Sequence, residues 1–510
     1  MVLCLFLVLS VFLTSCRSNN NDSNTSTDNT ITSGTQSNAP GWDAEKNRWI
    51  SSLDPNKYKG QNKQFKVLIM GSSYGTYSSR EFTFSEDSVL LSEVINDAAG
   101  KKNEYIEDHY GVKIVPVYAE NVSGSSIIDL IRAEINSNSG AYDAIMPYFS
   151  TLTTFAAEGS LVDLSDTNFG GTGLDLTQTL DFSKPWWDKT SITDLAIRDK
   201  VFFVAGDITL LNKVLTRAVV FNKDLIAKYD LESPYDLVDD GIWTFDKMYE
   251  MALKNVSDSD GDGLMTHTDN WGMITAYGDL VDFYFGSGYN FAKLDSNKEP
   301  ILTVNGTAEV GVINKILEKL NDRSWHIPTE ECGFETSEMW DKALAIFGEG
   351  RAMFRMGSFS AVEKLKMRHT ANYGIVPLPK MSPEQDRYYS YVSAGAVSGI
   401  SMLNSTPDVE FSAYMIEVNA VEGKNYLTPA YYELVLKKQA AQDPESVRML
   451  DLVFDTIYYD LGGVYNFGNI HTVLNGLVRD KSMEVVSSLD AIKQTAEESM
   501  RKLVEKFDEM

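Results

Sequence analysis

Cysteine and positive charge are both scarce in this sequence. Only three of its 510 residues are Cys, at positions 4, 16 and 332, and Cys332 stands alone in the body of the chain. A disulfide framework is therefore excluded there. Lys and Arg number 45 against 72 Asp and Glu, which gives a net charge of −27. This balance excludes nucleic acid as a partner, because phosphate binding needs clustered cations, and it argues against docking on anionic lipid through a basic patch.

Motifs of metal and phosphate chemistry are also missing. The five histidines form no H-E-x-x-H pair, no G-x-x-x-x-G-K phosphate loop is present, and Cys332 has no motif around it. We therefore expect the chain not to be an enzyme. Because 72 carboxylates make an acid/base pair easy to imagine, a secreted glycoside hydrolase is the enzyme alternative.

Long apolar runs are confined to the start of the chain. Residues 2–13 are almost wholly apolar, a length typical of signal peptides and too short to span a bilayer. The Leu-Thr-Ser that precedes Cys16 resembles the bacterial lipobox, in which the Cys receives a lipid. We expect a signal peptide at residues 1–15, lipidation of Cys16 and a flexible, polar tether over residues 16–40. A lipid anchor would hold the protein at the cell membrane, on its extracellular face or in the periplasm.

The body of the chain alternates strand and helix patterns. Strand-like apolar runs at residues 65–70, 112–118 and 142–146 are separated by helical spacing at residues 89–110 and 127–135. This order is typical of βαβ units. It predicts an α/β fold with a parallel sheet flanked by helices.

The sharpest chemical motif is an acidic loop at residues 258–269. In the twelve-position pattern of EF-hand loops, Asp falls at positions 1, 3 and 5, and Gly falls at position 6, where a sharp turn needs it. Three carboxylates within five residues repel one another unless a hard cation neutralises them. An acidic surface turn is the alternative. We expect a structural calcium ion bound by Asp258, Asp260, Asp262, the Leu264 carbonyl, Thr266 and Asp269.

Five short segments, in order along the chain, carry a resemblance to a known family. They are residues 141–147 (Ala-Tyr-Asp-Ala-Ile-Met-Pro), 219–225 (Val-Val-Phe-Asn-Lys-Asp-Leu), 241–245 (Gly-Ile-Trp-Thr-Phe), 347–353 (Phe-Gly-Glu-Gly-Arg-Ala-Met) and 373–380 (Tyr-Gly-Ile-Val-Pro-Leu-Pro-Lys). Together they resemble the family 1 extracellular solute-binding proteins, the lipoprotein receptors of carbohydrate-type ABC importers.

The resemblance implies a type II periplasmic-binding-protein fold, in which two α/β lobes are joined by crossing strands and enclose a ligand cleft. Lobe 1 would comprise residues 63–207 plus 378–425, and lobe 2 residues 208–377 plus 426–510. The crossings would lie near residues 204–207 and 377–380.

The resemblance also implies a receptor that closes around an oligosaccharide or other small solute and delivers it to ABC permease subunits. We expect the receptor to be a monomer. A calcium-stabilised surface adhesin is the alternative among interaction proteins.

Aromatic rings are expected to line a sugar site, because they stack on the apolar faces of sugars. By resemblance to maltose-type receptors, the cleft is lined by residues after the strand at 144–146, which nominates Tyr148. Tyr277 and Phe359 are nominated in the same way, the latter by the turn after residues 352–356.

Three further positions are candidates from their place in the sequence. Asp207 lies at the first crossing and could accept hydrogen bonds from sugar hydroxyls. Trp271 follows the acidic loop directly, so the loop could hold it at the cleft. Trp186 and Trp187 are adjacent and would face opposite sides of a strand, so at most one could reach a ligand.

Overall fold

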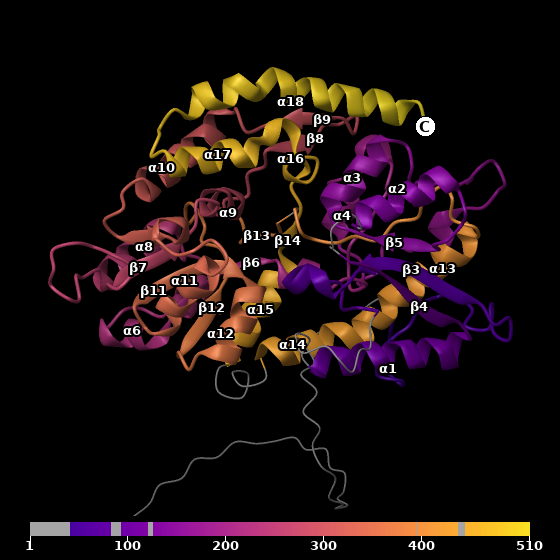
Figure 1. Cartoon of the computed structure of the whole chain (residues 1–510), viewed down its shortest axis with the longest axis horizontal. Coiled ribbons are helices and arrows are strands. Elements are labelled where there is room, and N and C mark those ends of the chain that lie inside the picture. The colour runs from indigo at the N-terminus through magenta and orange to yellow at the C-terminus, as the bar shows by residue number, and fades with distance from the viewer. Residues whose placement is uncertain (1–40, 83–92, 121–125, 394, 437–443) are drawn as a thin grey trace, which may run out of the picture.

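Two α/β lobes stand side by side, each around its own sheet (Figure 1). The computed structural model describes residues 41–82, 93–120, 126–393, 395–436 and 444–510. The predicted signal peptide, Cys16 and the tether lie outside the described residues. Among the helices of the described segments, none is both long and apolar enough to cross a membrane.

Lobe 1 is built on a parallel sheet with the strand order β4-β3-β5. Its strands are β3 (Gln64–Met70), β4 (Lys113–Ala119) and β5 (Ala144–Met146). The predicted alternation is confirmed, because α1 (Glu93–Tyr110) and α2 (Ile127–Ser137) lie between the strands in sequence. A capping box between Ser126 and Asp129 starts α2. The lobe is completed by α3 (Phe149–Ala157), α4 (Lys189–Thr193) and α13 (Val409–Glu422).

Lobe 2 is built on a mixed sheet with the strand order β10-β7-β11-β6-β12. β7 is parallel to both β10 and β11, whereas β6 runs antiparallel to both β11 and β12. The strands are β6 (Arg217–Asn222), β7 (Trp271–Thr275), β10 (His326–Pro328), β11 (Ala352–Ser358) and β12 (Tyr373–Val376). Its helices are α6 (Lys223–Lys228), α7 (Pro234–Asp239), α8 (Phe245–Ala252), α9 (Asp279–Gly286), α10 (Thr307–Leu320), α11 (Met339–Gly348) and α12 (Phe359–Arg368).

Two neighbouring segments carry the chain between the lobes. The first leaves lobe 1 after Val204 and reaches β6 through α5 (Leu211–Val214). The second returns shortly after Val392, which still pairs with Thr216, and Ile400 already pairs with Val204 in lobe 1. Both crossings therefore run side by side, as a hinge between two lobes requires.

The return crossing lies later in the chain than the sequence predicts, which is near residues 377–380. That segment remains in lobe 2 because it is bound to the start of α8. The Lys380 amide donates to the Trp243 carbonyl at 3.0 Å, and the Phe245 amide donates to the Lys380 carbonyl at 2.8 Å. Leu378 is buried in the core of the same lobe. The prolines end β12 there without marking the crossing.

Helices at opposite ends of the molecule also bridge the lobes. α14 (Thr428–Leu436) follows a π-helical turn and contacts α1 of lobe 1 and α12 of lobe 2. At the other end, α18 (Val485–Asp508) lies across the top of Figure 1, where it contacts α10 of lobe 2 and α3 of lobe 1. One core cluster is correspondingly continuous from Ile95 of lobe 1 to Ile346 of lobe 2.

Short strands and helices fill the rest of the described chain. They are β1 (Trp42–Asp43), β2 (Arg48–Trp49), β8 (Ala292–Leu294), β9 (Pro300–Leu302), β13 (Ser390–Tyr391), β14 (Ile457–Tyr458), α15 (Pro444–Asp455), α16 (Leu461–Val464) and α17 (Ile470–Arg479).

Candidate functional site

Three tyrosines gather where two neighbouring strands of lobe 1 end. Tyr148 follows β5, and its hydroxyl donates to the Tyr77 carbonyl at 3.3 Å. Tyr74 follows β3, and its ring lies edge-on to the Tyr148 ring with 6.2 Å between centroids. Tyr77 is 43 % exposed, so its ring is open to solvent. We call Tyr74, Tyr77 and Tyr148 the aromatic edge.

The sequence analysis found Tyr148 but not its two partners. A signal was present: β3 and β5 are neighbouring parallel strands, and the carboxyl ends of such strands meet at one edge of a sheet. Tyr74 and Tyr77 follow the first predicted strand just as Tyr148 follows the third. Burial raises the pKa of Tyr148, with smaller contributions from Tyr74 and Tyr77, so its hydroxyl is a neutral donor at physiological pH.

The same turn has the spacing of a nucleophile elbow. Residues 71–75 read Gly-Ser-Ser-Tyr-Gly, which matches G-x-S-x-G. That motif needs a strand, a sharp turn and an α-helix. Here β3 leads into a 3₁₀ segment, Ser72–Tyr77, which is interrupted at Gly75 by φ 59° and ψ −126°. The turn therefore lacks the geometry that exposes a nucleophilic serine.

The edge of lobe 2 where β7 and β10 end is charged. Tyr277 follows β7, and its amide donates to both oxygens of Glu330, which follows β10, at 3.3 Å each. Burial and the carboxylates of Glu331 and Glu330 raise the pKa of Tyr277. Burial also raises the pKa of Glu330. Glu331 is held by Arg323, with 2.7 Å between Oε1 and the guanidinium.

A buried ion cluster lies beside Tyr277. The Arg217 Nε donates to Asp282 at 2.7 Å, and its NH2 lies 3.6 Å from Asp279. The other oxygen of Asp279 accepts a hydrogen bond from the Ala276 amide at 2.9 Å. Burial and the charge of Asp282 raise the pKa of Asp279 to about 8, against the opposing charge of Arg217. We call Arg217, Asp279, Asp282 and Glu330, together with the Tyr277 that Glu330 holds, the charged edge.

An ion pair joins the two lobes near the aromatic edge. Arg80 lies a few residues beyond the aromatic edge, and its NH1 is 3.5 Å from Glu363 on α12 of lobe 2. The neighbouring Glu81 accepts a hydrogen bond from the Leu210 amide in the first crossing segment. α12 follows β11 directly, so these contacts bring the end of β3 toward the β11–α12 turn.

Asp207 is neutralised inside the crossing region. One carboxylate oxygen accepts from Lys213 at 2.9 Å and from Thr428 at 2.5 Å, and the other accepts from Lys424 at 3.1 Å. Burial would raise the pKa of Asp207, but the charges of Lys213 and Lys424 outweigh it and hold the pKa at about 2. The carboxylate therefore ties the first crossing to the start of α14. Its predicted role as a sugar acceptor stays a prediction.

Phe359 and Trp271 are packed in the core. Phe359 is fully buried, with its ring centroid 5.0 Å from that of Phe454. Trp271, the first residue of β7, is buried, and its indole donates to the Thr266 carbonyl at 2.7 Å. The structure does not bring either ring to the two edges that hold Tyr148 and Tyr277.

The two adjacent tryptophans do not point to opposite sides, as they would on a strand. Trp186 and Trp187 lie in a turn, and both are buried in lobe 1. Their indoles donate to the two oxygens of Glu417 at 3.1 and 3.0 Å. Because the backbone turns here, both rings reach the same carboxylate, and the expectation of opposite faces was wrong.

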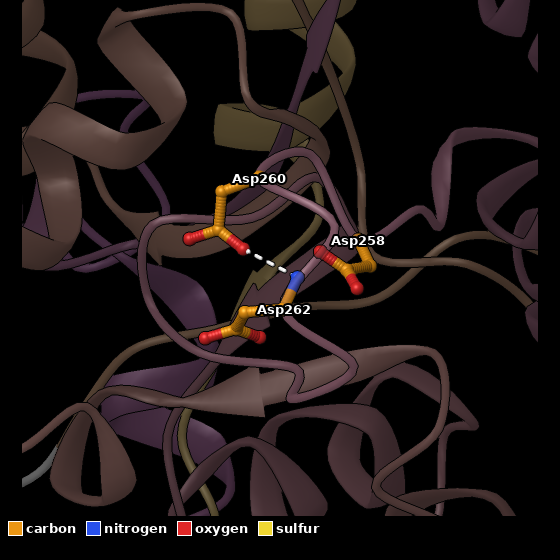
Figure 2. Close-up of side chains that lie close together, drawn as sticks. All are labelled: Asp258, Asp260 and Asp262. Atoms are coloured by element: carbon orange, nitrogen blue, oxygen red, sulfur yellow. Dashed lines mark hydrogen bonds between the residues drawn. The ribbon is translucent and has the colours of Figure 1, made fainter.

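The acidic loop brings three carboxylates together in lobe 2. Figure 2 shows Asp258, Asp260 and Asp262 around one point, and one oxygen from each lies within 4.8 Å of the others. Their remaining contacts are to the loop's own amides: Asp258 accepts from Gly261 and Gly263, and Asp260 from Asp262. Although the Asp262 amide stabilises its charged form, desolvation and the neighbouring carboxylates raise the pKa of Asp260.

The other three predicted ligands, Leu264, Thr266 and Asp269, do not belong to this cluster of three carboxylates. Asp269 is fully buried and accepts from the amides of Ser259 at 2.8 Å and Thr266 at 2.7 Å. Leu264 donates its amide to Asp262, and its side chain is exposed. Three of the six predicted ligands thus converge, while Asp269 closes the base of the loop.

Comparison with known proteins gives one family and a set of similar folds. The family described as bacterial extracellular solute-binding protein matches residues 91–417. No curated protein matches the sequence.

Solved structures match over most of their length. A cyclo/maltodextrin-binding protein complexed with maltotetraose is 13% identical, with a TM-score of 0.53, and covers 89% of this chain and 98% of its own. An ABC substrate-binding protein from Listeria monocytogenes in complex with cycloalternan is 12% identical, with a TM-score of 0.52 and coverage of 86% and 99%. An ABC transporter solute-binding protein from Agrobacterium radiobacter in complex with ribitol is 12% identical, with a TM-score of 0.50 and coverage of 86% and 99%. At these identities the likeness is one of fold, which agrees with the predicted two-lobed architecture.

Proposed function

Because the chain belongs to the bacterial extracellular solute-binding protein family, we propose that it is the receptor of an ABC importer and captures an oligosaccharide between its lobes. The family consists of binding proteins, so the chain is a solute-binding protein, and the glycoside hydrolase alternative is set aside. The similar structures named above hold maltotetraose, cycloalternan and ribitol, which supports a carbohydrate as the solute.

The observation that carries the proposal is the pairing of two unlike edges. Lobe 1 offers tyrosine rings, which suit the apolar faces of sugars, and lobe 2 offers buried charged groups, which suit hydroxyls. The ion pair between Arg80 and Glu363 joins the two lobes a few residues beyond the aromatic edge. A solute held between them would draw the lobes together about the two crossing segments.

The anchor and the permease belong to the same proposal. Lipid on Cys16 would hold the receptor at the extracellular face of the membrane or in the periplasm, and the tether at residues 16–40 would leave the lobes free to meet ABC permease subunits. A monomer suffices, because both edges come from one chain. Cys16→Ser should release the protein from membranes into the soluble fraction. Retention of that variant on membranes would contradict the anchor.

Calorimetry of the purified protein tests the solute class. We expect heat on addition of linear or cyclic oligosaccharides, together with a rise of the melting temperature. A panel of amino acids and peptides is the comparison. If a member of that panel binds while every saccharide fails, the carbohydrate assignment is wrong although the family membership stands.

A second proposal is that Asp258, Asp260 and Asp262 bind a structural calcium ion. Its support is the convergence of three exposed carboxylates, of which Asp258 and Asp260 accept hydrogen bonds from the loop's own amides. Calcium takes six to eight oxygen ligands, so the Leu264 carbonyl, Thr266 and Asp269 are the proposed additional donors. The ion would fasten the loop between α8 and β7 and take no part in chemistry.

Calorimetric titration with calcium tests the second proposal. Asp260→Asn should weaken binding, because it removes a charge and keeps the shape. Asp54→Asn is the matched control, because Asp54 accepts from the Asn56 amide at 2.9 Å in a similar exposed turn of the other lobe. Absence of calcium heat in the unsubstituted protein would mean that the loop is an acidic turn.

A further inference from the structure

Arg355 is a buried arginine near the carboxyl end of β11. It pairs with Val220 of β6 in the antiparallel ladder, so both side chains share one face of the lobe 2 sheet. Val220 belongs to the core cluster that also holds Leu344 of α11 and Val362 of α12, and these helices therefore cover that face. Only 6 % of Arg355 is exposed.

The guanidinium of Arg355 has no partner. Within the segments that the structure describes, it makes no hydrogen bond and no ion pair, and its Nε is buried without an acceptor. A buried charge without a partner is strongly unfavourable, and native proteins rarely keep one. Burial lowers the pKa of Arg355 to about 10, so it is still charged at neutral pH. The arrangement calls for an acceptor that the described segments do not supply.

The nearby acids are already occupied. Asp279 is shared between Arg217 and the Ala276 amide. Asp341, at the start of α11, accepts from Lys364 at 2.7 Å and from Arg368 at 2.8 Å. Neither carboxylate bonds to Arg355.

The other close groups bring no negative charge. Burial raises the pKa of Cys332 to about 12, so its thiol is neutral. Asp279 holds its proton at neutral pH through its raised pKa. Arg217 and Asp282 then balance each other, which leaves one positive charge on Arg355.

The missing acceptor has a definable chemistry. A guanidinium presents a planar fork that matches two oxygens of one carboxylate. A neutral hydroxyl pair would accept hydrogen bonds but leave the charge uncompensated, and a dianionic phosphate would overcharge a region that already holds Glu330 and Asp282. A single negative charge with two oxygens fits best.

We propose that Arg355 reads a carboxylate on the solute, so that the receptor takes acidic sugars such as uronic-acid oligosaccharides. The inference rests on the proposed function and narrows its substrate class. Arg355 would bind the carboxylate from lobe 2, while the aromatic edge of lobe 1 stacks on the sugar ring.

Calorimetry with matched sugars tests this inference. Galacturonic acid trimers and galactose trimers differ only in the carboxylate, and each is titrated into the purified full-length protein. We expect the acidic trimer to bind at least about tenfold more tightly, and Arg355→Gln to remove about 10- to 100-fold of that affinity. Arg132→Gln in lobe 1, which makes the same charge change on an exposed residue, should bind both trimers like the unsubstituted protein.

Each outcome separates the inference from the proposed function. If the neutral trimer binds as tightly as the acidic one, or if Arg355→Gln binds the acidic trimer unchanged, the inference is overturned and the receptor proposal stands. If neither trimer nor any other saccharide binds while another solute class does, both are overturned.

A ligand-free measurement gives an independent test. Arg355→Met removes an unpartnered charge and keeps the volume, so its melting temperature should equal or exceed that of the unsubstituted protein. Arg217→Met removes a paired charge from the neighbouring strand and should lower the melting temperature. A fall for Arg355→Met as large as that for Arg217→Met would show that Arg355 serves the fold and would overturn the inference.

Discussion

Lobe 1 and lobe 2 end their strands in different chemistry. In lobe 1 the turns after β3 and β5 carry Tyr74, Tyr77 and Tyr148. The rings of Tyr74 and Tyr148 lie edge-on to each other, and the Tyr77 ring is open to solvent. In lobe 2 the ends of β7 and β10 and the start of β6 carry Arg217, Asp279, Asp282 and Glu330, of which Asp279 and Asp282 are buried.

The difference shows how two lobes can divide the recognition of a sugar. An exposed ring needs no buried partners before the ligand arrives. It binds a sugar mainly through apolar contact area, with modest directionality. A buried charge must be held by its own partners before a ligand arrives, and it then reads hydrogen-bond geometry. Substitutions should therefore act mainly on affinity in lobe 1 and on both stability and selectivity in lobe 2.

The largest effect is expected from breaking the buried ion cluster of lobe 2. Arg217→Met leaves Asp282 charged and without its partner, which should lower the free energy of unfolding by about 3–5 kcal/mol. Chemical denaturation measures the change. Arg132→Met breaks the exposed pair with Glu158 in lobe 1 and should leave the midpoint nearly unchanged. Equal losses for the two variants would remove the distinction between the lobes.

Calcium removal should act on lobe 2 alone. An ion present at 100 times its dissociation constant adds about 2.7 kcal/mol of stability, which chelation withdraws. Hydrogen exchange should then accelerate at residues 257–271, and the strands of lobe 1 should keep their protection. Faster exchange in both lobes, or in neither, would contradict a calcium ion held by the loop between α8 and β7.

A pH dependence should follow from Asp279. Burial and Asp282 raise its pKa in the folded protein to about 8, against about 3.9 when unfolded. The folded state therefore binds the proton more tightly, and its stabilising contribution is present below the unfolded pKa and lost as pH rises toward 8. The expected slope is on the order of 1 kcal/mol per pH unit between pH 5 and 8. Asp279→Asn should flatten it in denaturation curves.

Lobe 1 contains a matched case in Glu417. Burial raises its pKa to about 8 despite the two indole donors, Trp186 and Trp187. Glu417→Gln should reduce the same slope from the other lobe. An unchanged pH profile in both variants would mean that neither carboxyl holds its proton in the folded protein.

The smallest effect is expected at the aromatic edge. Tyr77→Ala removes an exposed ring, so stability should hardly change, while affinity for a bound saccharide should fall about tenfold. Tyr118→Ala on β4 removes a ring of similar exposure, 45 % against 43 %, that is not one of the three aromatic-edge tyrosines, and serves as the control. Calorimetry should find the control unaltered; a loss of equal size there would place the ligand elsewhere.

The sequence predicts the architecture better than the site. Apolar runs locate β3, β4 and β5, because burial dictates their composition, and the helical spacing locates α1 and α2. Tyr148 could be found from its strand, and the same rule applied to β3 would have found Tyr74.

The features that the sequence did not predict depend on contacts between segments that are distant in the chain. Asp207 is neutralised by Lys424, more than two hundred residues away, and no local pattern announces that pairing. The return crossing moves past residues 377–380 because Lys380 binds the start of α8. Arg355 stands out only through its missing partner, which requires the surrounding side chains to be known.

The central claim is that one solute touches both lobes. The most direct test is the calorimetric affinity of a bound saccharide for Tyr77→Ala in lobe 1 and Tyr277→Ala in lobe 2, each beside the unsubstituted protein. The account predicts that both substitutions weaken the same saccharide by about tenfold or more. If either variant binds that saccharide with undiminished affinity, the solute does not lie between these two edges.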